Sequence, residues 1–385
     1  MAWFEFATAA RIIFGPGALV EIGPIAKEFG RRALIVTGGH PDRAGKLVSL
    51  LHEQGIETTT FSFAGEPTVE SARSGVKAAH QCGSDLVIGF GGGSAIDTGK
   101  AIAALVRNGG DPLDYLEGIG TGRALTQPSA PYIAIPTTAG TGAEVTRNAV
   151  LGSPEHRVKV SLRSPHMLPR VALIDPELTF HLPPEITATT GMDALTQLIE
   201  AFVSNRANPM TDTLCRDGIQ RAARSLRSAY LEGGNLEART DMSLAALYSG
   251  IALANARLGA VHGIAGPLGG MITAPHGAIC ARLLPIVMAA NLKAIQERDP
   301  GSPSFDRFKI VAQLLTGRQS ASVEDGASFL ENLCSDFSIP RLGHHGLTES
   351  DLPQLIANSL KSSSMQGNPI QLTHIEVEDI IHSAM

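Results

Sequence analysis

Short apolar runs alternate with amphipathic segments along the first half of this chain. Each run has about the length of a strand that is buried in a parallel sheet. Helix-like segments such as 72–80 and 95–106 lie between the runs, and this alternation predicts a parallel sheet with helices on both faces. The apolar runs are residues 33–37, 86–90, 132–136 and 171–175.

The pattern changes near residue 180, where strand-like runs give way to long segments of helical periodicity. Residues 175–184 are rich in helix breakers and mark the boundary. We expect a Rossmann-like α/β domain that binds a dinucleotide over residues 1–180, and an all-helical domain over residues 181–385. The expected helices of the second domain are 191–203, 209–230, 236–258, 277–297, 304–316 and 322–336.

Composition narrows the class of protein. The 385 residues are 43% hydrophobic and 18% charged, with a net charge of -6 and no basic block, which argues against nucleic acid as a partner. No apolar segment reaches the roughly 18 residues of a membrane span, and the N-terminus lacks the pattern of a signal peptide. The four cysteines lie far apart, which excludes a disulfide framework and a cysteine zinc site. We expect a cytoplasmic protein.

A glycine-rich turn follows the run 86–90 and opens a helix. Such a turn lets the backbone approach a phosphate, and the helix N-terminus offers unpaired N–H groups to the anion. The spacing matches neither G-x-G-x-x-G nor a Walker P-loop. The alternative is a capping box between Ser94 and Asp97. Three consecutive glycines exceed what a cap requires, so we expect this turn to bind a phosphate. The candidate cofactor-binding residues here are Gly91, Gly92, Gly93, Ser94 and Asp97.

A second polar turn, residues 136–146, follows the next run. Ligands of open α/β sheets bind at the carboxyl ends of the strands, and two such turns after neighbouring strands favour a dinucleotide. The candidate cofactor residues here are Thr137, Thr138, Thr141 and Thr146. Lys159, in the strand-like run 157–161, is a further candidate, although a lone lysine is more often a surface residue.

The stretch 191–197 carries the strongest chemical signal. In a helix, Asp193 and Gln197 share one face, and apolar residues take the opposite face. A desolvated carboxylate needs a partner. His262 and His276, flanked by helix-breaking residues, could supply it through a shared cation. The alternative is that both histidines are ordinary core or loop residues and that a box from Thr190 to Asp193 caps the helix.

Five motifs in this order resemble the iron-containing, or group III, alcohol dehydrogenase family. The resemblance extends from about residue 14 to beyond residue 285, and it implies a dehydroquinate synthase-like fold. The motifs are Gly-Gly-Gly-Ser-Ala-Ile-Asp (91–97), Pro-Thr-Thr-Ala-Gly-Thr-Gly-Ala-Glu-Val-Thr (136–146), Gly-Met-Asp-Ala-Leu-Thr (191–196), Val-His-Gly (261–263) and Pro-His-Gly (275–277).

The resemblance implies that Asp193, His262 and His276 hold Fe²⁺ or Zn²⁺ and serve catalysis. The family has histidine at the position of Gln197, whose neutral amide oxygen is a poorer ligand. Many members also have a histidine, thought to relay a proton, where this chain has Gly266. The implied activity is hydride transfer between NAD(P)(H) and a small alcohol or its aldehyde or ketone, with the metal as Lewis acid.

Cofactor preference has one clue. NAD-preferring members of the family place an aspartate directly after the apolar run that corresponds to residues 33–37. This chain has Gly38 at that position, so no acidic side chain repels the 2′-phosphate of NADP. We expect both cofactors to be used.

Other activities stay open. Arg147, Arg163 and Arg257 would suit a carboxylate-bearing substrate, as in the related maleylacetate reductases, although each arginine taken singly is more often a surface salt-bridging residue. An activity like that of glycerol-1-phosphate dehydrogenase or dehydroquinate synthase is disfavoured, since residues 190–285 contain no lysine. A nucleotide-binding regulatory protein with a degenerate metal site is the non-enzymatic alternative. Helical domains of this kind often self-associate, so we expect a homodimer.

Overall fold

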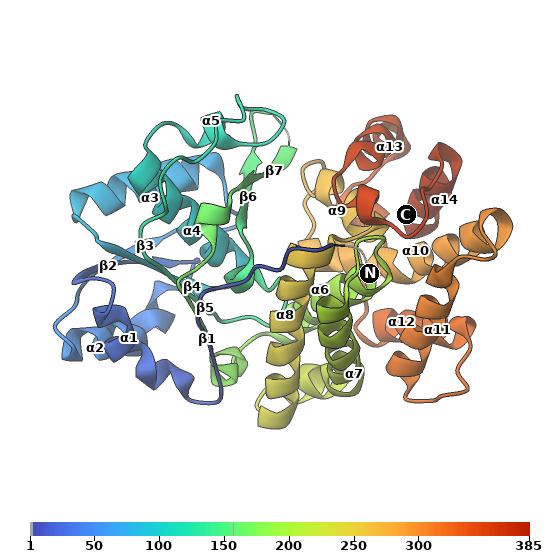
Figure 1. The fold of residues 1–385 in the computed structure, drawn as a ribbon, viewed down its shortest axis with the longest axis horizontal. Helices are drawn as coiled ribbons and strands as arrows, with labels where there is room; N and C mark the ends of the chain where they lie inside the picture. Colours follow the sequence, from blue (N-terminus) through green and yellow to red (C-terminus); the bar gives the residue numbers. More distant parts are fainter. Residues whose placement is uncertain (1–2, 157) are drawn as a thin grey trace. The chain divides into compact units, whose positions relative to one another are not determined.

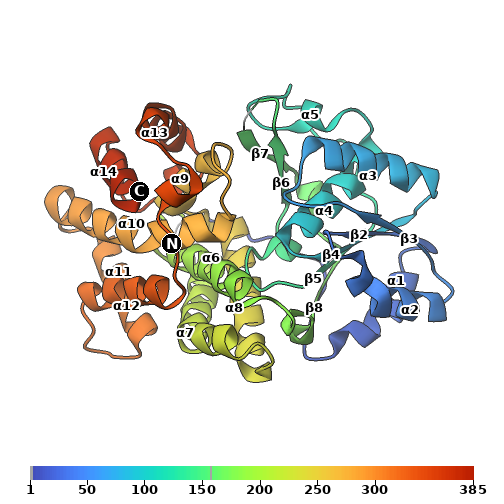
Figure 2. The ribbon, with the colours of Figure 1, turned by 180° about the vertical axis from the view of Figure 1, so that it is seen from behind.

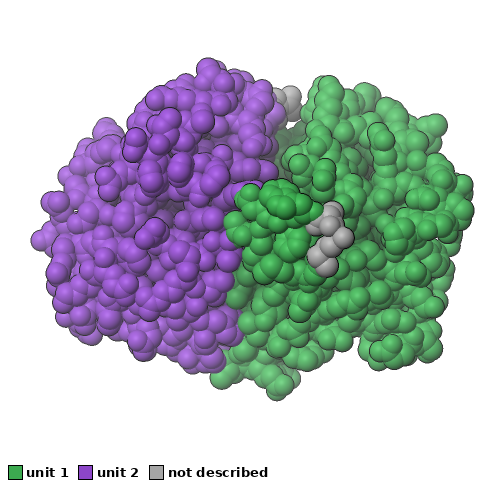
Figure 3. Space-filling view, viewed as in Figure 1, with its two compact units in different colours: residues 1–7, 139–141, 181–385 green, residues 8–138, 142–180 purple. Residues whose placement is uncertain are grey.

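The computed structural model describes residues 3–156 and 158–385. They form two compact units (Figure 3). The first, called the α/β unit below, comprises residues 8–138 and 142–180. The second, the helical unit, comprises residues 139–141, 181–385 and the N-terminal segment up to Ala7. Arg157, the first residue of the strand-like run expected at 157–161, lies outside the described residues.

A six-stranded parallel sheet forms the centre of the α/β unit, in the order β1-β8-β5-β4-β2-β3. Its four inner strands are the four that the apolar runs predict. The two edge strands carry no such run, because β3 is largely polar and β1 has three residues. The strands are β1 (Ile12–Phe14), β2 (Arg32–Thr37), β3 (Glu57–Ser62), β4 (Leu86–Gly91), β5 (Tyr132–Pro136) and β8 (Val171–Ile174).

Helices cover both faces of this sheet (Figures 1 and 2). Alternate residues of each inner strand point to opposite faces, so Ile35 packs with α1 and α2 while Leu34 and Val36 pack with α3 and α4. The inner strands are apolar throughout because both faces are buried. The fold class predicted for this unit is confirmed. The helices are α1 (Ile22–Lys27), α2 (Gly45–Glu53), α3 (Val69–Gln81), α4 (Gly93–Asn108) and α5 (Pro112–Tyr115).

An antiparallel hairpin of β6 (Asn148–Ser153) and β7 (Val158–Arg163) lies apart from the parallel sheet. A buried lysine attaches it to α4. Lys100 Nζ donates to the carbonyls of Ala143 and Asn148 and to Thr146 Oγ1, and it lies 3.0 Å from Asp97 Oδ1. Burial of an ammonium group requires such partners, and losing one of them would leave an uncompensated buried charge.

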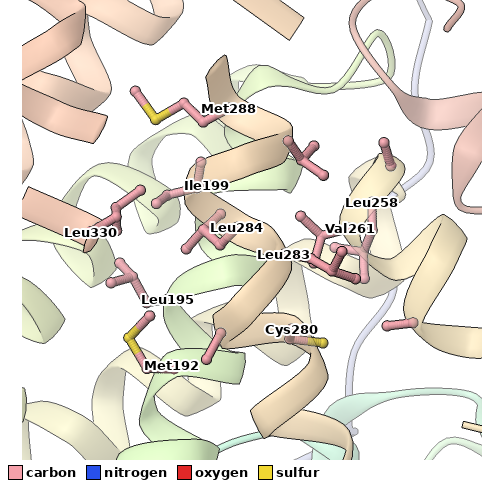
Figure 4. Close-up of a cluster of buried hydrophobic side chains, with 14 of the residues drawn as sticks. Met192, Leu195, Ile199, Leu258, Val261, Cys280, Leu283, Leu284, Met288 and Leu330 are labelled. Carbon is pink, nitrogen blue, oxygen red and sulfur yellow. The ribbon is translucent and has the colours of Figure 1, made fainter. Parts of the chain in front are cut away.

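The helical unit is built around α6 (Pro184–Val203), which packs against α7, α8 and α10. Met192, Leu195 and Ile199 face Leu284 and Met288 of α10 in an apolar cluster (Figure 4). The six predicted helices are all present, and α9, α13 and α14 are additional. The remaining helices are α7 (Pro209–Leu231), α8 (Leu236–Ala256), α9 (Ala260–Leu268), α10 (His276–Arg298), α11 (Pro303–Thr316), α12 (Val323–Asp336), α13 (Leu352–Lys361) and α14 (His374–Ala384).

One helix has the length and mean hydropathy of a membrane span. Within the described residues, α10 passes this test by itself, and α8 with α9 passes it as a pair bent by 97°. The expectation that no segment is long enough is therefore wrong for α10. Its most apolar window is 72% buried inside the structure, which is typical of a core helix.

The α/β unit contains a buried acid whose ionisation destabilises the fold. Burial raises the pKa of Glu144 to about 7, and the negative charge of Asp97 adds to this effect while Lys100 opposes it. The folded chain therefore holds a proton that the unfolded chain has lost, and stability falls as pH rises from about 4.5 to about 7.

Glu144→Gln is expected to raise the melting temperature at pH 8 more than at pH 5, because the amide removes the buried charge. Thermal unfolding at the two pH values measures the difference. Glu53→Gln, at an exposed position of α2, is the matched control. An equal shift at both pH values would contradict the role given to Glu144.

Candidate metal centre

Helix α6 presents three buried polar side chains along one stripe. Asp193, Gln197 and Glu200 are 2%, 3% and 4% exposed, and the spacing of four and seven residues places them on one face. The helix begins at Pro184, so Thr190 is interior and its Oγ1 donates to the carbonyl of Ile186 at 2.7 Å. The alternative in which a box from Thr190 to Asp193 caps this helix is therefore wrong.

The structure brings the two predicted histidines to Asp193. His262 Nε2 lies 3.2 Å from Asp193 Oδ1, and His276 Nε2 lies 3.9 Å from the same oxygen. With Cys280 Sγ, one donor atom from each residue lies within 4.8 Å of the others. Three helices, α6, α9 and α10, supply this group. A carboxylate and two imidazoles at such distances are a donor set suited to a divalent cation.

A second carboxylate, which sequence reasoning missed, orients His262. Glu200 Oε2 lies 2.6 Å from His262 Nδ1, and Glu200 Oε1 accepts the Val261 N–H at 2.6 Å. The carboxylate thus caps the first turn of α9 and fixes the imidazole with Nδ1 as donor and Nε2 towards Asp193. The sequence signal that could have identified Glu200 is its spacing of seven residues from Asp193, which places both carboxylates on one face of the helix.

His276 is placed by the close approach of two helices. It is the first residue of α10, after Pro275, and Gly277 follows it. A Cβ at Gly277 would lie 2.1 Å from the carbonyl oxygen of Thr189, so only glycine allows α10 to start this close to α6. The Pro-His-Gly sequence therefore sets the position of the imidazole opposite Asp193.

The ionisable groups of the site stabilise one another's charged forms. Burial alone would raise the pKa of Asp193, but the hydrogen bond to His262 and the charge on His276 lower it below its usual range. Burial opposes protonation of His262, yet the electrostatic interaction with Cys280 and the bonds to Asp193 and Glu200 raise its pKa well above the usual value. The interaction with Cys280 likewise raises the pKa of His276.

Two further observations fit a cation at this place. Among the described residues, Gln197 Oε1 is buried and has no hydrogen-bond partner. A buried amide oxygen without a partner is costly, and a cation on the same helix face would satisfy it. At Gly266, where the family resemblance implies a histidine, a Cβ would have no heavy atom of the described chain within 4 Å, so there is open space beside it.

In the α/β unit, the structure brings several candidate cofactor residues together at the carboxyl ends of β4 and β5. The Thr137 N–H donates to the carbonyl of Gly91 at 2.9 Å, and a Cβ at Gly92 would touch Thr138 at 3.2 Å. Gly91 has a φ of 154°, and a Cβ there would lie 3.8 Å from the Gly38 nitrogen. Helix α4 begins at Gly93 with no side-chain cap, which leaves its first N–H groups available to an anion.

Other candidates have structural partners. Ser94 lies in the first turn of α4, and the predicted box with Asp97 is wrong, because Asp97 pairs with Lys100 and accepts the Val150 N–H at 3.0 Å. Thr146 accepts from Lys100. Lys159 Nζ lies 3.3 Å from Glu66 Oε2, and Thr141 belongs to the helical unit.

All four cysteines are free, as the sequence predicts. Cys280 nevertheless lies within the donor group of the metal centre, where no cysteine was expected.

Comparison with known families identifies the chain. The profile of the iron-containing alcohol dehydrogenases matches residues 9–176, and that of the C-terminal region of the Fe-containing alcohol dehydrogenase family matches residues 187–385. The chain belongs to the iron-containing alcohol dehydrogenase family. It is an oxidoreductase that interconverts alcohols and aldehydes.

Named relatives match over nearly the whole chain. Alcohol dehydrogenase 4 of Saccharomyces cerevisiae is 36% identical, covering 96% of this chain and 96% of its own length. The 1,3-propanediol dehydrogenase of Klebsiella pneumoniae is 36% identical, covering 99% of this chain and 98% of its own. The structure of sulfoacetaldehyde reductase from Bifidobacterium kashiwanohense in complex with NAD⁺ has a TM-score of 0.87 and 28% identity, covering 100% of this chain and 99% of that one.

Glu200→Gln is expected to weaken binding of a divalent metal by about 10- to 100-fold, the usual effect of losing a carboxylate that orients a ligating histidine. Competition with a chelator measures the affinity. Glu185→Gln, an exposed position in the first turn of the same helix, should leave it unchanged. Equal affinities of the Glu200→Gln and Glu185→Gln proteins would show that Glu200 does not orient a ligand.

Proposed function

We propose that this alcohol dehydrogenase holds Fe²⁺ or Zn²⁺ with Asp193, His262 and His276, and that Gln197 serves as a weaker fourth donor. The helical residues 181–385 form the metal-binding, catalytic domain in this proposal. The observation that carries it is the convergence of the three donor atoms on one point from three separate helices. The unpartnered Gln197 Oε1 supports the assignment of the fourth position.

The bound metal would supply Lewis-acid chemistry that lowers the pKa of an alcohol or polarises a carbonyl. The chain's residues prepare this chemistry. Asp193 provides a negative charge that offsets part of the cation's charge, and Glu200 holds His262 Nδ1 protonated so that Nε2 is a free donor. Because Gly266 carries no side chain that could move a proton, water in the open space beside it or a ribose hydroxyl of the cofactor would have to do so.

The nucleotide cofactor in this proposal is NAD(P)(H), held in the α/β unit. Gly91, Gly92 and Gly93 allow the pyrophosphate to approach the first N–H groups of α4, and Ser94 lies in the same turn. Thr137 and Thr138 lie beside these glycines. Thr141, Thr146, Asp97 and Lys159 are secondary candidates, and the last three act first through the structural contacts described above.

The substrate class in this proposal is a small alcohol and its carbonyl compound. The names of an alcohol dehydrogenase and a 1,3-propanediol dehydrogenase among the relatives support it over the carboxylate-bearing substrate of a maleylacetate reductase. A third relative acts on sulfoacetaldehyde, which carries an anionic sulfonate, so an acid-bearing aldehyde is the alternative. Arg163, one of the arginines considered for a carboxylate, pairs with Glu117. We expect a cytoplasmic homodimer.

The activity test uses protein freed of metal with a chelator and then reloaded with Fe²⁺ or Zn²⁺. We expect NAD(P)H-dependent reduction of short aldehydes and oxidation of the matching alcohols only after reloading. Asp193→Asn should reduce kcat/KM by at least about 100-fold, since it removes the anionic ligand. Full activity of the metal-free protein, or of Asp193→Asn, would refute the proposed metal centre.

Cofactor preference is tested by Gly38→Asp. The position has no heavy atom of the described chain within 4 Å of a new Cβ, and its φ is not left-handed, so the variant should fold. A carboxylate there would accept hydrogen bonds from the ribose hydroxyls of NAD and would repel the 2′-phosphate of NADP. We expect the ratio of kcat/KM for NADH over NADPH to rise by about tenfold or more, which is about 1.4 kcal/mol. Gly39→Asp is the matched control, and an equal loss with both cofactors would contradict the role of Gly38.

A further inference from the structure

The sulfur of Cys280 lies beside the two histidines of the candidate metal centre. This residue is fully buried on α10, one turn after His276, and this spacing places both side chains on the same face of the helix. Its Sγ lies 3.7 Å from His262 Nε2 and 3.6 Å from His276 Nε2. These are the two nitrogen atoms that the proposed function assigns to the metal.

The surroundings of Cys280 differ from those of the other buried cysteines. Cys334 Sγ donates to the carbonyl of Ala281 at 3.1 Å, and burial raises the pKa of its thiol to about 11. Burial likewise raises the pKa of Cys215. Cys280 instead directs its sulfur away from Met192 of the apolar cluster (Figure 4) and towards nitrogen donors.

We propose that Cys280 is a metal ligand, so that the chain holds its cation with one carboxylate, two imidazoles and one thiolate. This inference rests on the proposed metal centre and specifies its chemistry. The four donor atoms, all within 4.8 Å of one another, make up a tetrahedral-type set without Gln197. Cys280 then takes the fourth position that the proposed function gave to Gln197, and the buried Gln197 Oε1, on the same helix face as Asp193, is left as a weaker outer donor.

The thiolate changes which metal the site prefers. Binding breaks the S–H bond of Cys280, releases the proton to solvent and forms a metal–sulfur bond, with no change of oxidation state. Thiolate and imidazole ligands together favour Zn²⁺, whereas an all-oxygen or carboxylate-rich set favours harder cations. This chain is therefore expected to retain zinc in preference to ferrous iron.

Cobalt substitution tests the ligand directly, without relying on activity. Co²⁺ is loaded into the metal-free full-length protein, and the near-ultraviolet region is examined for a thiolate-to-cobalt charge-transfer band. We expect this band in the unaltered protein and in Cys82→Ser, a control at a half-buried position in the α/β unit that is not part of the donor group. Cys280→Ser should bind Co²⁺ without the band, and its zinc affinity should fall by at least about tenfold.

The outcomes separate the two proposals. If the unaltered protein binds one Co²⁺ that is lost in Asp193→Asn but shows no charge-transfer band, the metal centre stands and the assignment of Cys280 is overturned. If Cys280→Ser keeps the band, the assignment is also overturned. If the protein binds no Co²⁺ at all, both proposals fail. The spectrum of the unaltered protein decides the matter even if Cys280→Ser does not fold.

Discussion

A carboxylate buried inside a helical core is the constraint on which the helical unit depends. Asp193 is 2% exposed, and an ionised carboxyl group without a partner would be too costly at such a depth. The surrounding helices provide cationic or cation-binding partners: α9 brings His262 and α10 brings His276. A second carboxylate, Glu200, then fixes the first imidazole and the first turn of α9. The apolar face of α6 supports this arrangement by packing against α10 (Figure 4).

In the α/β unit, the important feature is that the first backbone N–H groups of α4 are left without side-chain partners. Helix α4 starts directly after three glycines and carries no side-chain cap. Asp97, which the sequence offered as the partner of Ser94 in a capping box, instead binds Lys100 and the hairpin of β6 and β7. The first N–H groups of the helix are thereby left for an anion, and the buried lysine connects the same helix to the hairpin.

Burial explains which elements could be predicted. Strands β2, β4, β5 and β8 are apolar because helices cover both faces, whereas β3 at the edge is polar and gave no signal. The start of α6 was missed because Pro183 and Pro184 look like a boundary, although proline is favoured in the first turn of a helix. Asp193, His262 and His276 could be predicted because their sequence motifs resemble those of the family, whereas the residues alone left an ordinary core or loop role open. Cys280 could not, since a single cysteine in an apolar helix is typical of a core position.

Anomalous diffraction from crystals of the zinc-loaded protein tests the central claim most directly, because it locates the metal rather than its effects. The account predicts one strong peak at the zinc edge, within coordination distance of Asp193 Oδ1, His262 Nε2 and His276 Nε2. A peak elsewhere in the chain, or no peak in protein that contains zinc at full stoichiometry, would contradict it.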